Sequence, residues 1–229
     1  MQPNAGPAPR RGTALTRDTV IDAAADLVHR EGYRALTIRG LANRLGVGAM
    51  TLYSYVRTKD DLLGALAERF LFDADLSFDE GLPWREQLAE LFETVRREFL
   101  EHPELVPFVA RQRLVGPGPY RGMEMALRIL RCSGLTDAQC VDAFGALIAF
   151  TIGSVQREIG LREAGAVAFP GLGGLPQDGY TNVIEVASLL AARDPAHEFS
   201  RGLDLLLRGI EAWIDNPDTG AADREQGER

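Results

Sequence analysis

The chain contains little of what enzymes and metal proteins usually depend on. Its 229 residues include only two cysteines, Cys132 and Cys140, and three histidines, His29, His102 and His197. Two cysteines cannot build a disulfide framework or a zinc site, so two free thiols are expected, with a redox switch as the less favoured alternative. The histidines are scattered, and no glycine-rich phosphate loop follows a strand. We therefore predict that the chain is not an enzyme and holds no cofactor or metal.

Long apolar runs are also missing. The best candidate, residues 143–155, is shorter than the roughly 20 residues that cross a bilayer, and it contains two glycines. The N-terminus is rich in Pro, Ala and Gly and lacks the apolar core of a secretory signal. We expect no association with membranes and a cytoplasmic location.

No segment alternates apolar and polar residues over a useful length, so the predicted fold is all-α. Residues 1–13 and 216–229 have no apolar face to bury and are expected to be disordered. Between them, apolar residues recur at helical spacing, bounded by capping residues, glycines and prolines. The expected helices are 16–31, 37–45, 49–55, 60–72, 83–101, 120–132, 136–159, 181–192 and 195–214, with a short segment at 104–115, a turn at 116–119 and a mobile loop at 161–178.

The net charge of −8 is unevenly distributed along the chain. Residues 10–60 contain nine basic and five acidic side chains, a net charge of +4, whereas the rest contains 16 basic and 28 acidic ones, a net charge of −12. A weakly basic end on an acidic body suggests that only this end meets a polyanion. Arg10 and Arg11 would reach DNA phosphates from a loose arm, although a solvated tail is the favoured reading. The acidic group at 73–80 is interpreted as a solvated connector in preference to a cation site.

Residues 35–66 have the layout of a helix-turn-helix. Thr37 is the natural cap of a short helix, Gly46 supplies the turn, and Leu52 and Val56 point inward from the next helix. Such a motif lays its second helix in the major groove of DNA. Lys59, which is the single lysine of the chain, follows one turn later at the start of a longer helix, for which Asp60 is the expected cap.

The side chains of this motif divide into phosphate-binding and base-reading groups. Thr37, Arg39 and Lys59 stand at helix starts, where a hydroxyl or a cation and the backbone N–H groups can bind phosphate. The outward side chains of the second helix are small or amphipathic and carry no charge, which favours the reading of shape and thymine methyl groups. For Tyr53 a packing role is the favoured alternative, and Arg44 and Arg57 are read equally well as solvated charges. The outward positions are Gly48, Ala49, Met50, Thr51, Ser54 and Tyr55.

This segment resembles the tetracycline-repressor (TetR) family of bacterial transcriptional regulators over about residues 16–66. The resemblance implies that Thr37, Arg39, Thr51, Tyr53, Tyr55 and Lys59 contact DNA. The C-terminal part is similar, more loosely, to the tetracycline repressor subgroup through residues 150–155, 201–203 and 207–209. The matching N-terminal residues are Leu36-Thr37, Arg39, Leu41-Ala42, Leu45-Gly46-Val47, Thr51-Leu52-Tyr53, Val56, Lys59 and Leu62-Leu63.

The resemblance also implies a homodimer, a ligand cavity in the C-terminal domain and release from a palindromic operator when a ligand binds. The tetracycline repressor itself holds a magnesium–drug chelate with a histidine and a glutamate, and these positions fall near Val109 and Arg157. Neither residue can act as such a ligand, so tetracycline sensing and a metal in the pocket are not expected. The alternative function is a ligand-independent DNA-binding regulator, or an activator that works through protein partners.

Two groups of apolar residues are candidates for the cavity and the dimer seam. The candidates for the cavity fit an apolar or amphipathic effector of drug size, with simple core as the alternative for any one residue. They are Phe92, Val95, Phe99, Val109, Met123, Leu127 and Phe144, with Gln112, Arg113, Thr151 and Gln156 as polar contacts. The last two long helices, 136–159 and 195–214, carry more apolar surface than one domain needs, which favours a dimer interface of four helices, two from each copy (the dimer seam). The two DNA-binding domains of such a dimer would lie about 34–36 Å apart, one turn of DNA. The seam candidates are Ala143, Ala146, Leu147, Phe150, Leu203, Leu206, Leu207 and Ile210.

The predicted organisation follows from these assignments. Residues 14–62 form a three-helix DNA-binding domain, and residues 63–215 form a larger helical domain for ligand binding and dimerisation. The predicted function is a transcriptional repressor released from its operator by a small molecule.

Overall fold

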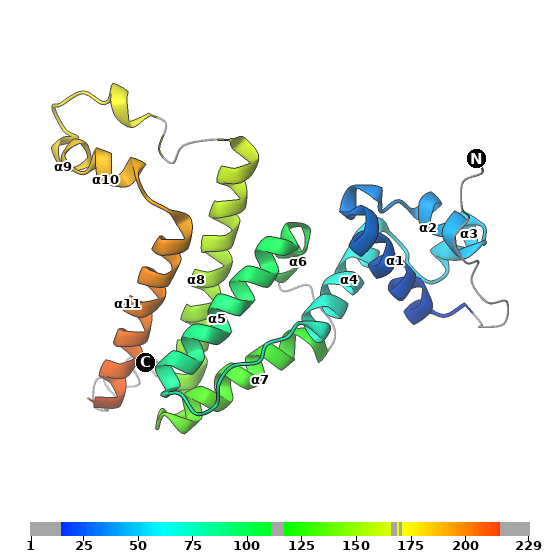
Figure 1. Cartoon of the computed structure of the whole chain (residues 1–229), viewed down its shortest axis with the longest axis horizontal. Coiled ribbons are helices and arrows are strands. Elements are labelled where there is room, and N and C mark those ends of the chain that lie inside the picture. Colours follow the sequence, from blue (N-terminus) through cyan, green and yellow to red (C-terminus); the bar gives the residue numbers. More distant parts are fainter. Residues whose placement is uncertain (1–14, 111–116, 166–168, 170, 216–229) are drawn as a thin grey trace, which may run out of the picture. The chain divides into compact units, whose positions relative to one another are not determined.

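The computed structural model describes residues 15–110, 117–165, 169 and 171–215, and its regular elements in these residues are all helices (Figure 1). The predicted all-α fold is confirmed. The expected disordered arms at 1–13 and 216–229, with Arg10 and Arg11, lie outside the described residues. The chain divides into two compact units, and each is described by itself. The N-terminal unit runs to Asp73 and includes Pro107–Pro119, and the C-terminal unit comprises Ala74–Val106 and the residues from Tyr120 onward.

The N-terminal unit is built from α1 (Arg17–Glu31), α2 (Ile38–Leu45), α3 (Ala49–Tyr53) and α4 (Lys59–Asp73). A capping box begins α1, because the Thr16 side chain accepts the Thr19 N–H while the Thr19 side chain accepts the Thr16 N–H. The helix α1 packs against both α2 and α4. The completely buried side chains at the centre of this unit are Val20, Leu36, Leu41, Leu52, Val56, Leu62 and Leu66.

The start of α4 differs from the expectation that Asp60 caps it. The hydroxyl of Thr58 accepts the N–H of Asp61 at 3.0 Å, so Thr58 is the capping residue and Asp60 lies in the first turn. The predicted domain boundary after residue 62 falls inside α4, and the contacts keep all of α4 in the N-terminal unit. The boundary between the functional domains stays a prediction.

The C-terminal unit has three long helices as its centre: α5 (Trp84–Glu101), α8 (Asp137–Ala164) and α11 (Pro195–Asp215). They lie side by side in Figure 1, and α8 contacts both α5 and α11. The helix α7 (Pro117–Cys132), which starts at the last residues grouped with the other unit, adds Ala126, Ile129 and Leu130 to their shared core. The short helix α6 (Val106–Ala110) begins at the boundary between the units.

Three helix limits differ from those predicted. Of the expected turn at 116–119, residues 117–119 form the start of α7, because Pro117 lacks an N–H and is compatible with the first helical position, and residue 116 lies outside the described residues. The helix α8 continues five residues beyond Ile159, until Gly165 adopts the left-handed conformation at φ 54° and ψ 26°. The segment 181–192 forms two short helices, α9 (Thr181–Glu185) and α10 (Ala187–Ala191), because Val186 leaves helical geometry at φ −102° and ψ 4°.

The helix α8 is more apolar than the sequence interpretation of residues 143–155 allowed. Within the described residues one segment, Asp137–Glu163, could span a bilayer by length and composition, with a mean hydropathy of 1.5 in its most apolar 18-residue window. One face of α8 packs against α5 and α11, as core helices of helical domains do. Only 28% of that window is buried, so part of this apolar helix faces outward in the described protomer.

Candidate nucleic-acid interface

The support helix of the motif, α2, is held at its start by the predicted cap. Thr37 Oγ1 accepts the N–H of Gly40 at 3.0 Å, and both Thr37 and Arg39 are exposed. A Cβ at position 40 would lie 2.9 Å from Thr37 Oγ1, so a larger residue there would require the Thr37 side chain to shift. Because the Thr37 oxygen serves as the acceptor, its O–H remains for a phosphate oxygen.

The turn between α2 and α3 is built on Gly46. This residue adopts φ 68° and ψ 28°, and the next N–H, from Val47, donates to Ala42 O at 3.0 Å. An L side chain rarely adopts such a φ, which explains the glycine. Leu52 and Val56 are completely buried beyond the turn, so α3 is held by its inward face.

The outward face of α3 is free of charged groups. Gly48, Met50, Thr51, Tyr53 and Ser54 are exposed. Met50 reaches 82% exposure and Tyr53 45%, so Tyr53 is not buried in the core. Two further predicted contacts, Ala49 and Tyr55, are half-buried against the core of this unit. The Ser54 hydroxyl donates to Thr51 O at 2.6 Å, which engages its proton within the helix end.

Basic side chains precede and follow α3 along the chain. Lys59 is exposed as the first residue of α4. In the part of the chain that the structure describes, no ion pair engages Arg39, Arg57 or Lys59. Arg44 does pair, with Glu31 at 3.5 Å, which favours its reading as a solvated charge. An uncharged helix flanked by available cations suits a duplex, because cations bind the phosphates while the helix meets the bases.

The predicted pocket residues lie in different environments. Phe92, Val95, Leu127 and Phe144 belong to one hydrophobic core in the C-terminal unit, where Phe99 is buried and Met123 half-buried. Thr151 is buried, but its hydroxyl donates to Leu147 O at 2.8 Å, and Gln156 is exposed. Val109 is half-buried and belongs to the segment grouped with the N-terminal unit, whereas Gln112 and Arg113 lie outside the described residues.

An open groove of about 490 Å³ lies between α5 and α11 and was not predicted. Arg85 bridges its two walls, with 2.9 Å distances to both Asp204 and Glu211. Ser200 donates to Glu93 across the same groove at 2.5 Å. None of the predicted pocket residues lines it, and its apolar floor is Ala89, Leu203 and Leu207.

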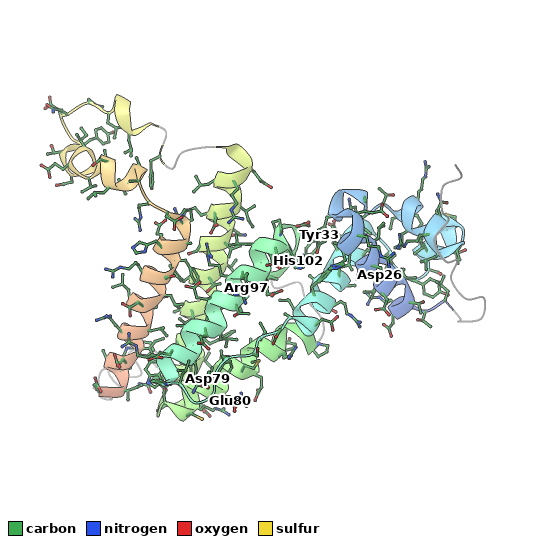
Figure 2. All side chains as sticks on the ribbon, viewed as in Figure 1. Asp26, Tyr33, Asp79, Glu80, Arg97 and His102 are labelled. Carbon is green, nitrogen blue, oxygen red and sulfur yellow. The ribbon has the colours of Figure 1, made fainter. Side chains whose placement is uncertain are left out.

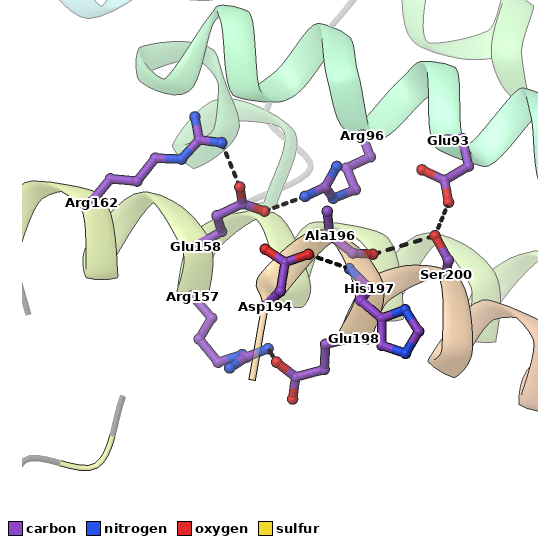
Figure 3. Close-up of polar contacts among 10 residues, drawn as sticks. All are labelled: Glu93, Arg96, Arg157, Glu158, Arg162, Asp194, Ala196, His197, Glu198 and Ser200. Atoms are coloured by element: carbon purple, nitrogen blue, oxygen red, sulfur yellow. Dashed lines mark hydrogen bonds and ion pairs between the residues drawn. The ribbon is translucent and has the colours of Figure 1, made fainter. Parts of the chain in front are cut away.

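A buried charge network in the C-terminal unit was missed by sequence reasoning (Figure 3). Glu158 accepts hydrogen bonds from Arg96 on α5 and from Arg162 one turn further along α8. The Arg96 guanidinium also lies 5.2 Å from the centre of the Phe199 ring on α11. The i, i+4 pair of Glu158 and Arg162 is visible in the sequence, but nothing local indicates Arg96.

Arg157, which is expected to fall near the place of a metal-binding glutamate in the tetracycline repressor, pairs with Glu198 of α11 (Figure 3). Glu198 also accepts from Arg193 at 2.8 Å. An arginine engaged in this way offers no ligand to a cation, which supports the expectation derived from its residue type.

The acidic connector before α5 is held by its own chain, and Asp79 and Glu80 mark it in Figure 2. Asp75 accepts the Ser77 N–H at 3.1 Å, and the hydrogen bonds from Ser77 lower the pKa of Asp75. Asp79 accepts the Gly81 N–H at 2.8 Å, and Glu80 pairs with Arg128 at 3.0 Å. These contacts favour the connector interpretation over a cation site.

A carboxylate–histidine group at the end of α5 and the two cysteines are the remaining side chains that could carry chemistry. Glu98, Glu101 and His102 bring their ligand atoms within 4.8 Å of one another at the end of α5, a proximity that i, i+3, i+4 spacing on one helix produces by itself. The two cysteines are free thiols, Cys132 exposed and Cys140 buried. Burial raises the pKa of the Cys140 thiol, which makes it a poor nucleophile.

The predicted dimer residues point mainly inward. Ala143, Leu147, Leu203, Leu207 and Ile210 are buried in the core of their own protomer, because α8 packs against α11 with these faces. Phe150 and Leu206 are half-buried against the same core, and Ala146 is exposed. The outward side of the two helices instead carries Val141 at 63% exposure and Leu205 at 70%, with the exposed small residues Gly145, Ala149 and Gly153 beside Val141 on α8.

Comparison with known families agrees with both units. Residues 20–66 match the family of bacterial regulatory proteins called tetR, and residues 79–214 match the tetracyclin repressor-like C-terminal domain. The chain belongs to the TetR family of transcriptional regulators. The resemblance read from both halves of the sequence is therefore confirmed, including the tetracycline repressor-like character of the C-terminal half.

Individual TetR-family relatives cover most of the chain. It is 30% identical over 214 residues to an HTH-type transcriptional regulator of Saccharopolyspora erythraea, covering 86% of this chain and 85% of the relative. It is 29% identical to the class D tetracycline repressor protein of Escherichia coli, with 87% and 91% covered. The crystal structure of ActR from Streptomyces coelicolor in complex with actinorhodin superposes with a TM-score of 0.73 at 27% identity, covering 88% of this chain and 99% of ActR. These TetR-family relatives are named as regulators, not as enzymes.

Proposed function

We propose that this TetR-family chain is a cytoplasmic, homodimeric repressor that binds a palindromic operator through α2 and α3 and leaves it when a small molecule binds the C-terminal unit. The observation that carries the proposal is the exposed, uncharged α3 flanked by Arg39, Arg57 and Lys59, which make no ion pair among the described residues. Cations on both sides of a neutral reading helix match the separation of phosphate contacts from base contacts.

The residues proposed to contact DNA are those predicted from the sequence, but the roles of Ala49, Tyr55 and Ser54 differ from the prediction. Thr37, Arg39 and Lys59 bind phosphates, and Gly48, Met50, Thr51 and Tyr53 face the groove. Ala49 and Tyr55 are half-buried, so they support the reading face and contact DNA only with their exposed edges. The Ser54 hydroxyl already donates its proton to Thr51 O, so Ser54 faces the DNA without a free hydrogen-bond donor on its side chain.

The dimer seam is assigned to the outward faces of α8 and α11. Five of the residues first considered are buried within the protomer, whereas Val141 and Leu205 are among the exposed large apolar side chains. Only 28% of the most apolar window of α8 is buried in one copy, which is the pattern of a helix whose other face is covered by a partner. The exposed small residues Gly145, Ala149 and Gly153 allow two such helices to approach closely.

The effector is an apolar or amphipathic compound of drug or natural-product size. ActR, a neighbour at a TM-score of 0.73, is known in complex with actinorhodin, and the likeness covers 88% of this chain. The candidate lining is Phe92, Val95, Phe99, Met123, Leu127 and Phe144, with Val109, Gln112, Arg113, Thr151 and Gln156 kept as predicted contributors. The places where a magnesium–tetracycline chelate would need imidazole and acidic ligands are expected to fall near Val109 and Arg157, so a different compound is expected.

The test is fluorescence anisotropy of the full chain with duplexes taken from beside its own coding region. Saturable binding at low salt, with one dimer per palindrome, is expected. Addition of an effector found by thermal-shift screening should then restore the anisotropy of free DNA. Indifference to every such duplex contradicts the repressor proposal, and tight binding that no compound relieves points to the ligand-independent alternative.

A further inference from the structure

The side chain of Met50 has no structural role in its own protomer. It is 82% exposed, which is the highest exposure among the large hydrophobic side chains of the described residues, and it lies in the second position of α3. The core below it is completed by Leu52 from the same helix, which is fully buried. A large apolar side chain displayed in this way needs an explanation outside the protomer.

The chemistry of the surrounding surface restricts what Met50 can recognise. No residue of α3 is charged, and the neighbouring cations Arg57 and Lys59 lie beyond the helix, where phosphates are the expected partners. A thioether donates no hydrogen bond and accepts only weakly, so it cannot read the donor and acceptor pattern of a base pair. The major groove offers one apolar group that distinguishes bases, the C5-methyl group of thymine.

We infer that Met50 is a specificity-determining residue that packs against a thymine methyl group at one symmetric position of each operator half-site. The inference rests on the proposed function, because it requires α3 to enter the major groove. Beyond the proposed function, this inference names the base, thymine, and the group on it, the C5-methyl, that α3 recognises. The flexible thioether adapts to the groove wall better than a branched side chain.

The experiment begins with selection of duplexes by the full chain from a randomised pool. In the selected operator, each symmetric pair of thymines is then replaced by uracil, which removes the methyl group and retains all hydrogen-bonding groups. At one position the wild-type protein should lose about fourfold in affinity per half-site and about fifteenfold in total, as expected for one methyl group returned to water on each side.

Variants of Met50 test whether this residue causes the loss of affinity for the uracil operator. Met50→Ala should bind the thymine and uracil operators equally, and Met50→Leu, which remains apolar, should keep the discrimination. Leu189→Ala removes another exposed apolar side chain, 70% exposed and in the C-terminal unit, and should leave the discrimination unchanged. Because Met50 is exposed, its replacement leaves the core intact.

The possible outcomes distinguish a failure of the Met50 assignment from a failure of the proposed repressor function. If no duplex is selected, the proposed function fails. If an operator is selected but the wild-type protein tolerates uracil at every position, or if Met50→Ala discriminates as strongly as the wild type, the repressor stands and the assignment of Met50 is wrong.

Discussion

Arg96 on α5 and Glu158 on α8 form an ion pair in the interior of the C-terminal unit, although 62 residues separate them in sequence. Both residues are buried, and Arg162 shares the same carboxylate. Phe199 of α11 lies against the Arg96 guanidinium. One carboxylate thus joins the helices that hold this unit together.

Glu158→Gln should destabilise the protein strongly. The substitution keeps the shape of the side chain but leaves the buried Arg96 without a counter-charge, and loss of one partner of a buried pair costs about 3–5 kcal/mol. The free energy of unfolding from chemical denaturation measures this loss. Glu80→Gln breaks the exposed pair with Arg128 and is the matched control, with an expected change below about 1 kcal/mol. Equal effects of the two variants would contradict a special role for the buried pair.

Lys59→Ala should reduce the salt dependence of operator binding. Each phosphate contact contributes about 0.9 to the slope of log K against log salt concentration, so a dimer that loses two contacts should lose about 1.8. Lys59→Arg keeps the charge and should keep the slope. A titration in which Lys59→Ala retains the wild-type slope would remove Lys59 from the phosphate contacts.

Gly202→Ala should destabilise the contact between α11 and α8. The added Cβ would lie 2.8 Å from Cε2 of Phe150 and closer still to Cζ. The Phe150 ring is stacked on the buried Phe199 at a centroid distance of 5.4 Å, so it cannot move away without disturbing the core. The expected loss is about 1–3 kcal/mol.

Gly122→Ala in α7 is the control for that substitution. Its Cβ would meet Leu76 Cδ1 at 3.4 Å, an ordinary van der Waals contact. The higher helix propensity of alanine should then stabilise the protein by about 0.5–1 kcal/mol. If thermal denaturation shows the two alanine variants shifted in the same direction, the close approach at Gly202 is not limiting.

Thr58→Ala should weaken the start of α4 by about 1 kcal/mol, because the Asp61 N–H loses its acceptor. Thr58→Ser retains the hydroxyl and should behave as the wild type. Asp60→Ala removes only a first-turn carboxylate from the positive end of the helix, worth about 0.3 kcal/mol. A larger loss for Asp60→Ala than for Thr58→Ala in urea denaturation would restore Asp60 as the cap.

Some features governed by neighbouring residues were predictable from sequence, and features governed by distant partners were not. The cap at Thr37 and the glycine turn at Gly46 are local, and the structure contains both. The cap of α4 is also local, but it was assigned to Asp60 where the structure has Thr58. The outward direction of Met50 follows from the same helical spacing that buries Leu52.

The dimer faces illustrate the limit of that reasoning. Apolar spacing identified Leu203 and Leu207 as positions to be covered, but the pattern does not say whether α5 and α8 of the same chain or a second copy covers them. In the structure, Leu203 and Leu207 are covered by helices of their own protomer. Arg96 and Glu158 show the same limit for charges, because only the fold brings them together.

The position of Lys59 has a practical consequence. It provides the single side-chain amine of the protein, and it is exposed at the start of α4, beside the reading helix. An amine-reactive reagent therefore modifies side chains at one place, on the surface that we propose meets the duplex. Protection of that amine from acylation by bound operator would give a covalent footprint of occupancy without any engineered label.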